Sequence, residues 1–170
     1  MQTFLPLATT NFSEIAKVLD NKRLNKQALE GWQIFMVLTE LDPDGNDRTP
    51  KGWVNHPAVR MWRGHELILA TYVQSMTSEW IRRGFKTTIQ EKLFDSLTSA
   101  MLKQKVKSYD LYSNLDDLMP KWMLDEKLFE EIASSHRSAL LVKDYNWYSQ
   151  FGWPEQSGPA ITEYEYVWPV

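Results

Sequence analysis

The chain has 170 residues, a length that suits one domain, and its formal net charge is -3. It contains no cysteine, which excludes disulfides, thiolate nucleophiles and cysteine-ligated metals. No stretch is apolar for long enough to span a bilayer, and the first residues lack the basic start and apolar run of a signal peptide. We therefore expect a cytoplasmic protein with no membrane association.

The charge is unevenly distributed along the chain. Residues 1–90 carry 11 Lys and Arg against 9 Asp and Glu, whereas residues 91–170 carry 8 against 13. An acidic total argues against a protein that binds nucleic acid through charge alone. We expect any nucleic-acid face to lie mainly on the N-terminal half.

Helical periodicity dominates the N-terminal part of the sequence. After an apolar lead over residues 1–7, it predicts a helix over 12–20, capped by Asn11, and a longer helix over about 20–41. Proline, glycine and aspartate then indicate a loop over 41–54.

The third predicted helix has the most regular pattern. Apolar residues recur at spacings of three and four over 59–80; we expect Asn55 to cap the helix and Gly84 to end it. Glu66 interrupts the apolar stripe, and a buried carboxylate needs a partner. We expect Arg63, three residues earlier, or an arginine from another helix to fill this role.

The C-terminal half predicts two further helices, over 88–102 and about 125–143, with a loop over 103–122 between them. The remainder, 144–170, is rich in aromatic residues and contains proline, so we expect it to wrap the surface in extended form. The expected fold class is all-α: a compact single-domain helical bundle over residues 1–170 with an extended aromatic C-terminal tail.

One face of the second predicted helix carries charged residues beside its buried stripe. Arg23, Lys26 and Glu30 are spaced by three and four residues and therefore share that face. Two interpretations remain open: a solvated strip of ion pairs, or a carboxylate held at the edge of the core with basic neighbours for phosphates.

The histidines suggest no metal site. His56, His65 and His136 lack metal-ligand spacing, and we expect neither a metal nor another cofactor. His136 and Arg137 are adjacent on the last predicted helix, where they either contact a phosphate or base or form hydrogen bonds on the helix surface.

The remaining nucleophiles are a lysine, a hydroxyl or the α-amine of the chain, since no phosphate-binding glycine loop or serine nucleophile elbow is present. The α-amine has a reference pKa of about 7.7–8.0, so much of it is unprotonated near neutrality. It can form an imine with a ring-opened sugar.

Four stretches resemble the pyrimidine-dimer DNA glycosylase/AP lyase family, the phage-type ultraviolet-damage endonucleases, and more closely its relatives of unproven activity. The stretches are 1–5, 19–30, 55–85 and 135–153. The most specific pieces are Glu79, Arg83, Gly84 and Phe85 at the end of the third predicted helix, and Trp147, Tyr148, Phe151 and Gly152 near the C-terminus.

The resemblance implies an all-α enzyme that acts as a monomer on double-stranded DNA with a damaged or modified pyrimidine. In the family, the N-terminal α-amine attacks C1′ and releases the base, and β-elimination from the Schiff base cuts the strand. A glutamate supports both steps. Carried onto this sequence, the amine belongs to Met1 or Gln2, and the glutamate is Glu30.

The resemblance also implies basic and aromatic residues that offset the cost of bending DNA and extruding a nucleotide, which is a few kcal/mol. The candidates for DNA contact are Arg23, Lys26, Arg60, Arg63, His136, Arg137, Trp147 and Tyr148.

The sequence departs from the family at three positions. Gln2 replaces a small residue, and its bulk makes removal of Met1 inefficient; Leu29 and Gln33 stand where the family has arginines. In addition, segments 41–54 and 103–122 look like additions that reshape the substrate groove.

Two further hypotheses remain open. The first is a non-catalytic DNA-binding module on the same scaffold, which the acidic charge and the altered N-terminus favour. The second is a helical protein that binds a partner protein through its aromatic tail. The residues of that surface would be Tyr164, Tyr166, Val167 and Trp168.

Overall fold

The computed structural model describes residues 2–106, 115–157 and 162–170, with residues 115 and 116 described by their backbone alone. Over these ranges the regular structure is helical, and an isolated antiparallel bridge joins Leu41 to Asp47. The all-α prediction is confirmed. Among the described residues, no helix is both long and apolar enough to cross a membrane.

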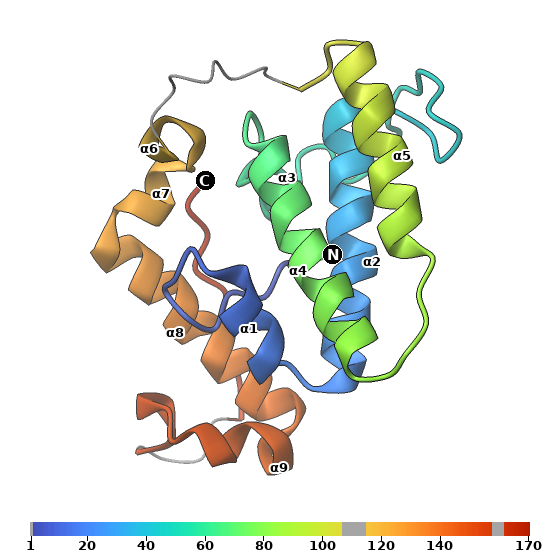
Figure 1. Cartoon of the computed structure of the whole chain (residues 1–170). Helices are drawn as coiled ribbons and strands as arrows, with labels where there is room; N and C mark the ends of the chain where they lie inside the picture. Colours follow the sequence, from blue (N-terminus) through green and yellow to red (C-terminus); the bar gives the residue numbers. More distant parts are fainter. Residues whose placement is uncertain (1, 107–114, 158–161) are drawn as a thin grey trace.

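The described helices form two groups (Figure 1). The most extensive helix–helix contact is between α2 and α4. Helix α5 packs on both of these helices, and α1 packs on α4. Helices α7 and α9 pack on α8. In chain order the helices are α1 (Phe12–Val18), α2 (Asn21–Thr39), α3 (Pro57–Arg60), α4 (Glu66–Arg82), α5 (Ile89–Leu102), α6 (Leu115–Leu118), α7 (Lys121–Leu124), α8 (Glu126–Lys143) and α9 (Tyr145–Tyr148), followed by the 3-10 turns η1 (Ser149–Phe151) and η2 (Pro154–Gln156).

Side-chain caps explain where the first two helices begin. The Asn11 side chain accepts a hydrogen bond from the Ser13 N–H, as predicted, and the Asp20 side chain accepts from the first N–H groups of α2. Such caps satisfy helix donors that have no partner within the helix. The first helix ends at Val18, two residues before the predicted end, because Leu19 is extended and leads into the Asp20 cap.

The prediction of one continuous third helix is wrong. The chain forms α3 and α4 instead, and Gly64 between them has φ of +82°, a left-handed conformation that glycine adopts readily. His56, not Asn55, caps α3: its Nδ1 accepts from the Ala58 N–H at 3.1 Å. The predicted end at Gly84 is confirmed, with φ of +88°.

Glu66 is buried, as predicted, but its partner is not the expected arginine. It opens α4, and its carboxylate accepts from the backbone N–H of Gly64 at 2.7 Å. Arg63 donates instead to the carbonyl of Val54 at 3.0 Å. The interruption of the apolar stripe therefore marks the start of a helix.

The later predictions are partly confirmed. The helices expected over 88–102 and 125–143 are α5 and α8. The sequence predicted a loop over 103–122, but α6 and the start of α7 lie within this range, so the prediction is wrong there. Residues 107–114 lie outside the described residues. Residues 162–170 have no regular secondary structure, and α9, η1 and η2 precede them, so the tail predicted over 144–170 is partly helical.

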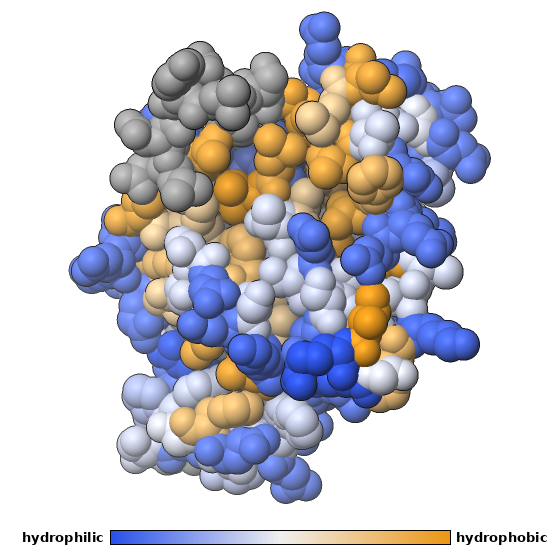
Figure 2. All heavy atoms as spheres, in the orientation of Figure 1, coloured by the Kyte–Doolittle hydropathy of each residue, from blue (hydrophilic) through white to orange (hydrophobic). Residues whose placement is uncertain are grey.

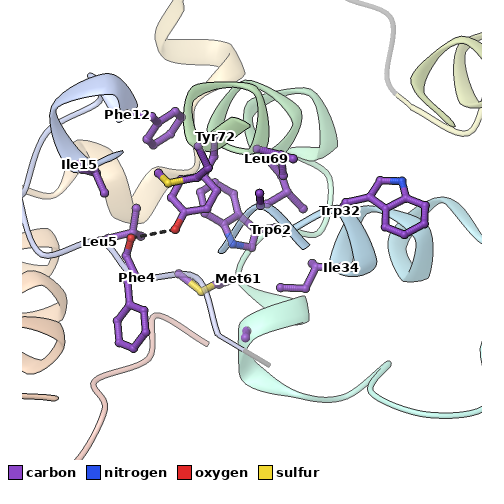
Figure 3. Packing of buried hydrophobic residues seen from close by; sticks show 14 of the residues in the cluster. Phe4, Leu5, Phe12, Ile15, Trp32, Ile34, Met61, Trp62, Leu69 and Tyr72 are labelled. Carbon is purple, nitrogen blue, oxygen red and sulfur yellow. Dashed lines mark hydrogen bonds between the residues drawn. The ribbon is translucent and has the colours of Figure 1, made fainter. Parts of the chain in front are cut away.

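The core is built around aromatic side chains that contact one another, edge to face for Tyr72 and Phe12 and tilted for Tyr72 and Trp62 (Figure 3). The Tyr72 ring lies 5.4 Å from Phe12 and 6.0 Å from Trp62 between centroids. Gly31 allows α2 to approach α4 closely, since a Cβ there would lie 2.6 Å from a methyl carbon of Val73. In Figure 2, apolar residues gather over the upper part of the face drawn, and the lower part is mostly polar.

Candidate active site

The N-terminal segment, residues 2–6, runs through the interior without a neighbouring strand. Its backbone groups are therefore paired with side chains of the surrounding helices, as buried peptide groups require. The Phe4 N–H donates to Gln27 Oε1 at 2.7 Å, and the Tyr72 hydroxyl donates to the Phe4 carbonyl at 3.0 Å (Figure 3). Helices α2 and α4 thus fix the path of the chain's beginning.

Helix α8 contributes a fully buried histidine to the same task. Nδ1 of His136 accepts from the Leu5 N–H at 2.9 Å, so the proton of the neutral ring is on Nε2. The Gln2 amide lies 2.6 Å from Nε2, and its oxygen satisfies that N–H, because the two ends of an amide are assigned from their partners. Burial lowers the pKa of His136 to about 3, and the ring therefore stays neutral.

These anchors bring the start of the chain to Glu30. The backbone nitrogen of Gln2 donates to Glu30 Oε2 at 3.2 Å. The Glu30 side chain is 13% exposed, and the Lys26 ammonium lies 3.7 Å from its other oxygen. Helix α2 therefore holds a carboxylate at the edge of the core, beside the first described backbone nitrogen.

Two hollows lie along α2, and Glu30 lines neither of them. One, of about 370 Å³, is lined in part by Gln33 and Val37, which follow Glu30 by three and seven residues. The other, of about 1000 Å³, is lined in part by Lys22 and Lys26, which precede it. Both hollows are open to solvent.

The C-terminal tail, residues 162–170, closes the site from the other side. It lies between α8 and α3 in Figure 1. Tyr166 packs on Phe4 with 6.3 Å between ring centroids, and on His136 with 5.5 Å. Burial raises the pKa of Tyr166, and the charges of Tyr164 and Glu30 add to the shift. The tail thus covers the N-terminal segment of its own chain.

A family model described as pyrimidine dimer DNA glycosylase matches residues 1–93, more than half of the chain. The chain belongs to the pyrimidine dimer DNA glycosylase family. The matched residues include the N-terminal segment, all of α2 and the α3–α4 break. No match was found among curated proteins or among solved structures. Family membership places the chain among DNA repair glycosylases, with DNA as the substrate.

Several residues predicted from the sequence to contact DNA are engaged inside the fold. Arg23 lies 3.3 Å from Asp20 and 3.5 Å from Asp144, and it donates to the carbonyl of Lys143 at 2.9 Å. It therefore joins the start of α2 to the end of α8. Of the predicted strip, Lys26 and Glu30 form a pair, and Arg23 faces a different set of partners.

His136 and Arg137 are also interior residues. Arg137 is 6% exposed and pairs with Glu130 at 2.6 Å and Glu155 at 2.8 Å. It also donates to the carbonyl of Pro6 at 3.1 Å. Both α8 side chains thus hold the N-terminal segment, and in this conformation neither presents the surface that a phosphate contact needs.

Trp147 and Tyr148 have structural partners as well. The Trp147 indole donates to the carbonyl of Val18 at 2.9 Å, and the fully buried Tyr148 hydroxyl donates to the Asp20 carboxylate. Burial raises the pKa of Tyr148, helped by the hydrogen bond to Asp20. Of the predicted DNA contacts, Lys26, Arg60 and Arg63 are the exposed ones.

The residues that position the N-terminus were not predicted from the sequence. Gln27 occupies a buried position of α2 between apolar neighbours, and a polar residue in such a stripe is a signal that it has a specific partner. Tyr72 gave no signal, because an aromatic residue in an apolar stripe looks like ordinary core. Among the described residues, no group of three His, Cys, Asp or Glu comes together to hold a metal.

Proposed function

We propose that this chain is a DNA glycosylase with AP lyase activity, which excises a damaged or modified pyrimidine through a Schiff base on its N-terminal amine. The observation that carries the proposal is the 3.2 Å contact between the Gln2 backbone nitrogen and Glu30 Oε2, in a chain that belongs to the family. Glu30 acts as the proton acceptor and donor beside the amine.

The chemistry needs an amine, a carboxylate and an accessible C1′. The amine lone pair forms a bond to C1′, the glycosidic bond breaks, and the base leaves with the bonding electrons and a proton. Nitrogen gives one of its two protons to the leaving base and the other, through Glu30, to O4′ as the C1′–O4′ bond breaks; this opens the sugar ring and forms the imine. Glu30, free again, accepts the proton from C2′. The 3′-phosphate then leaves with the electrons of the C3′–O bond, which cuts the strand.

Two residues remain candidates for the amine. If Met1 is removed, the Gln2 nitrogen is the amine and lies at the observed 3.2 Å from the carboxylate. If Met1 is retained, that nitrogen is an amide and the amine belongs to Met1, whose Cα lies about 3.8 Å from that of Gln2. Intact-mass measurement of the purified protein decides between them.

Borohydride trapping tests the proposal. The protein is incubated with ultraviolet-irradiated duplex and reduced, and we expect a covalent adduct on the N-terminal peptide. Selective acetylation of the α-amine is the matched control, and it removes the adduct. Absence of both adduct and strand cutting in the unmodified protein would exclude this chemistry.

The second candidate function is a non-catalytic DNA-binding module. It is favoured by the Gln2 side chain, which is 8% exposed and held by His136, because residue 2 then serves as a structural anchor. The discriminating measurement is binding to undamaged duplex over a range of salt. If binding weakens steeply as the salt concentration rises and no adduct is trapped, the result supports the DNA-binding module. If binding does not change with salt, the result contradicts both candidate functions, because both require contacts to DNA phosphates.

A further inference from the structure

Four rings from two segments far apart in the sequence contact one another in series. The ring centroids of Trp53 and His56 are 5.1 Å apart, those of His56 and Trp168 5.9 Å, and those of Trp168 and Tyr166 5.6 Å. Trp53 comes from the loop before α3, His56 caps α3, and the other two belong to the tail. We name these four residues the aromatic row.

The inner end of the aromatic row lies at the candidate active site. Tyr166 packs on Phe4 of the N-terminal segment. The Glu30 carboxylate also acts on two members of the row: it contributes to the raised pKa of Tyr166, and it opposes the burial that lowers the pKa of His56. The row therefore leads outward from Phe4 of the N-terminal segment to Trp53.

The outer end of the row is exposed and strained. Trp53 is 53% exposed, and its φ of 66° is left-handed, a conformation that a bulky side chain rarely adopts. Because the side chain is half exposed, burial of the indole offsets little of the cost of this backbone conformation. Strained residues of this kind cluster at functional sites, where the surrounding structure holds them.

The surroundings of Trp53 suit a polyanion with bases. The exposed cations Arg48 and Lys51 line the same hollow as Trp53. The His56 ring is fixed, because its Nδ1 accepts from the Ala58 N–H at 3.1 Å. Aromatic faces beside cations are the arrangement by which proteins bind unstacked nucleotides: the cations attract the backbone and the rings stack on the bases.

We propose that the aromatic row is a stacking site for an unpaired DNA base next to the Glu30 site, with Trp53 as the ring that receives the base. This inference rests on the DNA substrate of the proposed function, and it names the part of the protein that holds the displaced base. The cost of unstacking that base is offset by contact with the indole face.

The test compares binding to two duplexes, one fully paired and one with a single unpaired thymine, by fluorescence anisotropy. Wild-type protein prefers the duplex with the unpaired base. Trp53→Ala weakens that binding by about fivefold to about 150-fold, the range found per base stacked on an aromatic side chain, and leaves binding to the paired duplex unchanged. Phe94→Ala is the matched control, since Phe94 is 70% exposed on α5, and it changes neither.

Two further variants separate stacking from folding. Trp53→Phe keeps an aromatic face and retains most of the preference. Trp53→Gly removes the ring and relieves the left-handed backbone, so it raises the thermal midpoint above that of Trp53→Ala while binding as weakly. Equal binding of the two duplexes by wild-type protein, or wild-type binding by Trp53→Ala, overturns the proposal.

The outcome is distinguishable from failure of the enzyme. If the wild-type protein forms no borohydride adduct but Trp53→Ala abolishes the preference for the unpaired base, the stacking site is supported and the proposed chemistry is contradicted. If the adduct forms and Trp53→Ala does not change binding, the chemistry is supported and the stacking site is contradicted.

Discussion

Glu30 combines limited exposure with a charged neighbour and a backbone donor. Its carboxylate is 13% exposed, and Lys26 lies 3.7 Å from one oxygen while the Gln2 nitrogen lies 3.2 Å from the other. A group in this position can exchange a proton with the chain's beginning and still be reached by DNA. The periodicity of α2 and the family resemblance both indicated Glu30.

Glu30→Gln tests this role directly. The amide keeps the shape and an oxygen that accepts from Gln2, but it cannot accept a proton, and we expect single-turnover strand cutting to fall by about 100-fold or more. Binding to irradiated duplex should change by less than about twofold, because no phosphate contact is lost.

The matched control is Glu131→Gln on α8. Glu131 forms the same type of pair with a lysine four residues before it, at 3.9 Å, and its loss should leave cutting unchanged. Equal cutting by Glu30→Gln and wild type would show that the Lys26–Glu30 pair is only a surface pair.

The lowered pKa of His136 should make the stability of the folded protein depend on pH. Its pKa is about 3 in the folded protein and about 6.5 in an unfolded chain. Below pH 6.5 the unfolded chain binds a proton that the folded protein does not, so stability present above that pH is lost as the pH falls toward 3. The loss approaches about 1.4 kcal/mol per pH unit.

Urea unfolding of wild type and His136→Gln between pH 8 and pH 4.5 (about two units on the acid side of 6.5) measures this contribution. The free energy of unfolding of the variant is lower throughout, but it declines less steeply toward acid. Parallel curves for the two proteins would mean that the ring is protonated in the fold.

At the level of helices, periodicity and capping residues in the sequence predicted most helix boundaries, but they did not predict the break between α3 and α4. Helices α1, α2, α5 and α8 were expected within a few residues, because their apolar periodicity and caps such as Asn11 are local features of the sequence. The α3–α4 break was missed because apolar residues on both sides of it face the same core. Periodicity then continues across residues 61–65, although the helix does not.

The end of α4 is held by Glu79 and Arg83, two residues that carried the family resemblance but had no role assigned from the sequence. Glu79 is 5% exposed and pairs with Arg83 at 2.8 Å. Arg83 also donates to the carbonyls of Leu19 and Ala16 at 2.8 and 3.1 Å. One arginine thus joins α4 to the turn between α1 and α2, from which α2 carries Glu30.

Arg83→Met should lower the free energy of unfolding by about 2 kcal/mol or more, because it leaves a buried carboxylate with one partner and removes the donor to the carbonyls of Ala16, Lys17 and Leu19. Arg82→Met is the matched control: Arg82 pairs with the same Glu79 at 2.6 Å but is 67% exposed, and its loss should cost about 1 kcal/mol or less. Equal losses in urea unfolding would contradict the structural role of Arg83.

At the scale of the whole molecule, the site depends on contacts that no local pattern reveals. The N-terminal segment is held by Gln27 of α2, Tyr72 of α4 and His136 of α8, which are far apart in the sequence. The periodicity and the resemblance pointed to Glu30, and the resemblance pointed to the N-terminus as the proposed amine. The 3.2 Å between the Gln2 nitrogen and the Glu30 carboxylate depends on how the helices pack, and no local pattern predicts it.

The tail adds a long-range contact from the far end of the chain. Val167 donates to Ser135 on α8 at 3.2 Å, and Tyr166 packs on Phe4 and His136. Removing residues 162–170 should therefore expose the N-terminal segment. We expect the amide hydrogens of Phe4 and Leu5 to exchange at least about tenfold faster with solvent, since opening then breaks fewer contacts.

Removal of residues 169–170 alone is the control, because both lie beyond the rings that make these contacts. Unchanged exchange at Phe4 and Leu5 in the longer truncation would show that the helices hold the segment without the tail.

The burial of Gln2 has a practical consequence for recombinant work. Residues fused ahead of Gln2 would begin beside the Glu30 carboxylate, 3.2 Å from the Gln2 nitrogen, where the proposed chemistry needs room for a nucleotide. An N-terminal purification tag would therefore act as a built-in inhibitor, and its removal by a protease that leaves no extra residue would restore access. A tag at the C-terminus, where Val170 is 47% exposed, avoids that obstruction.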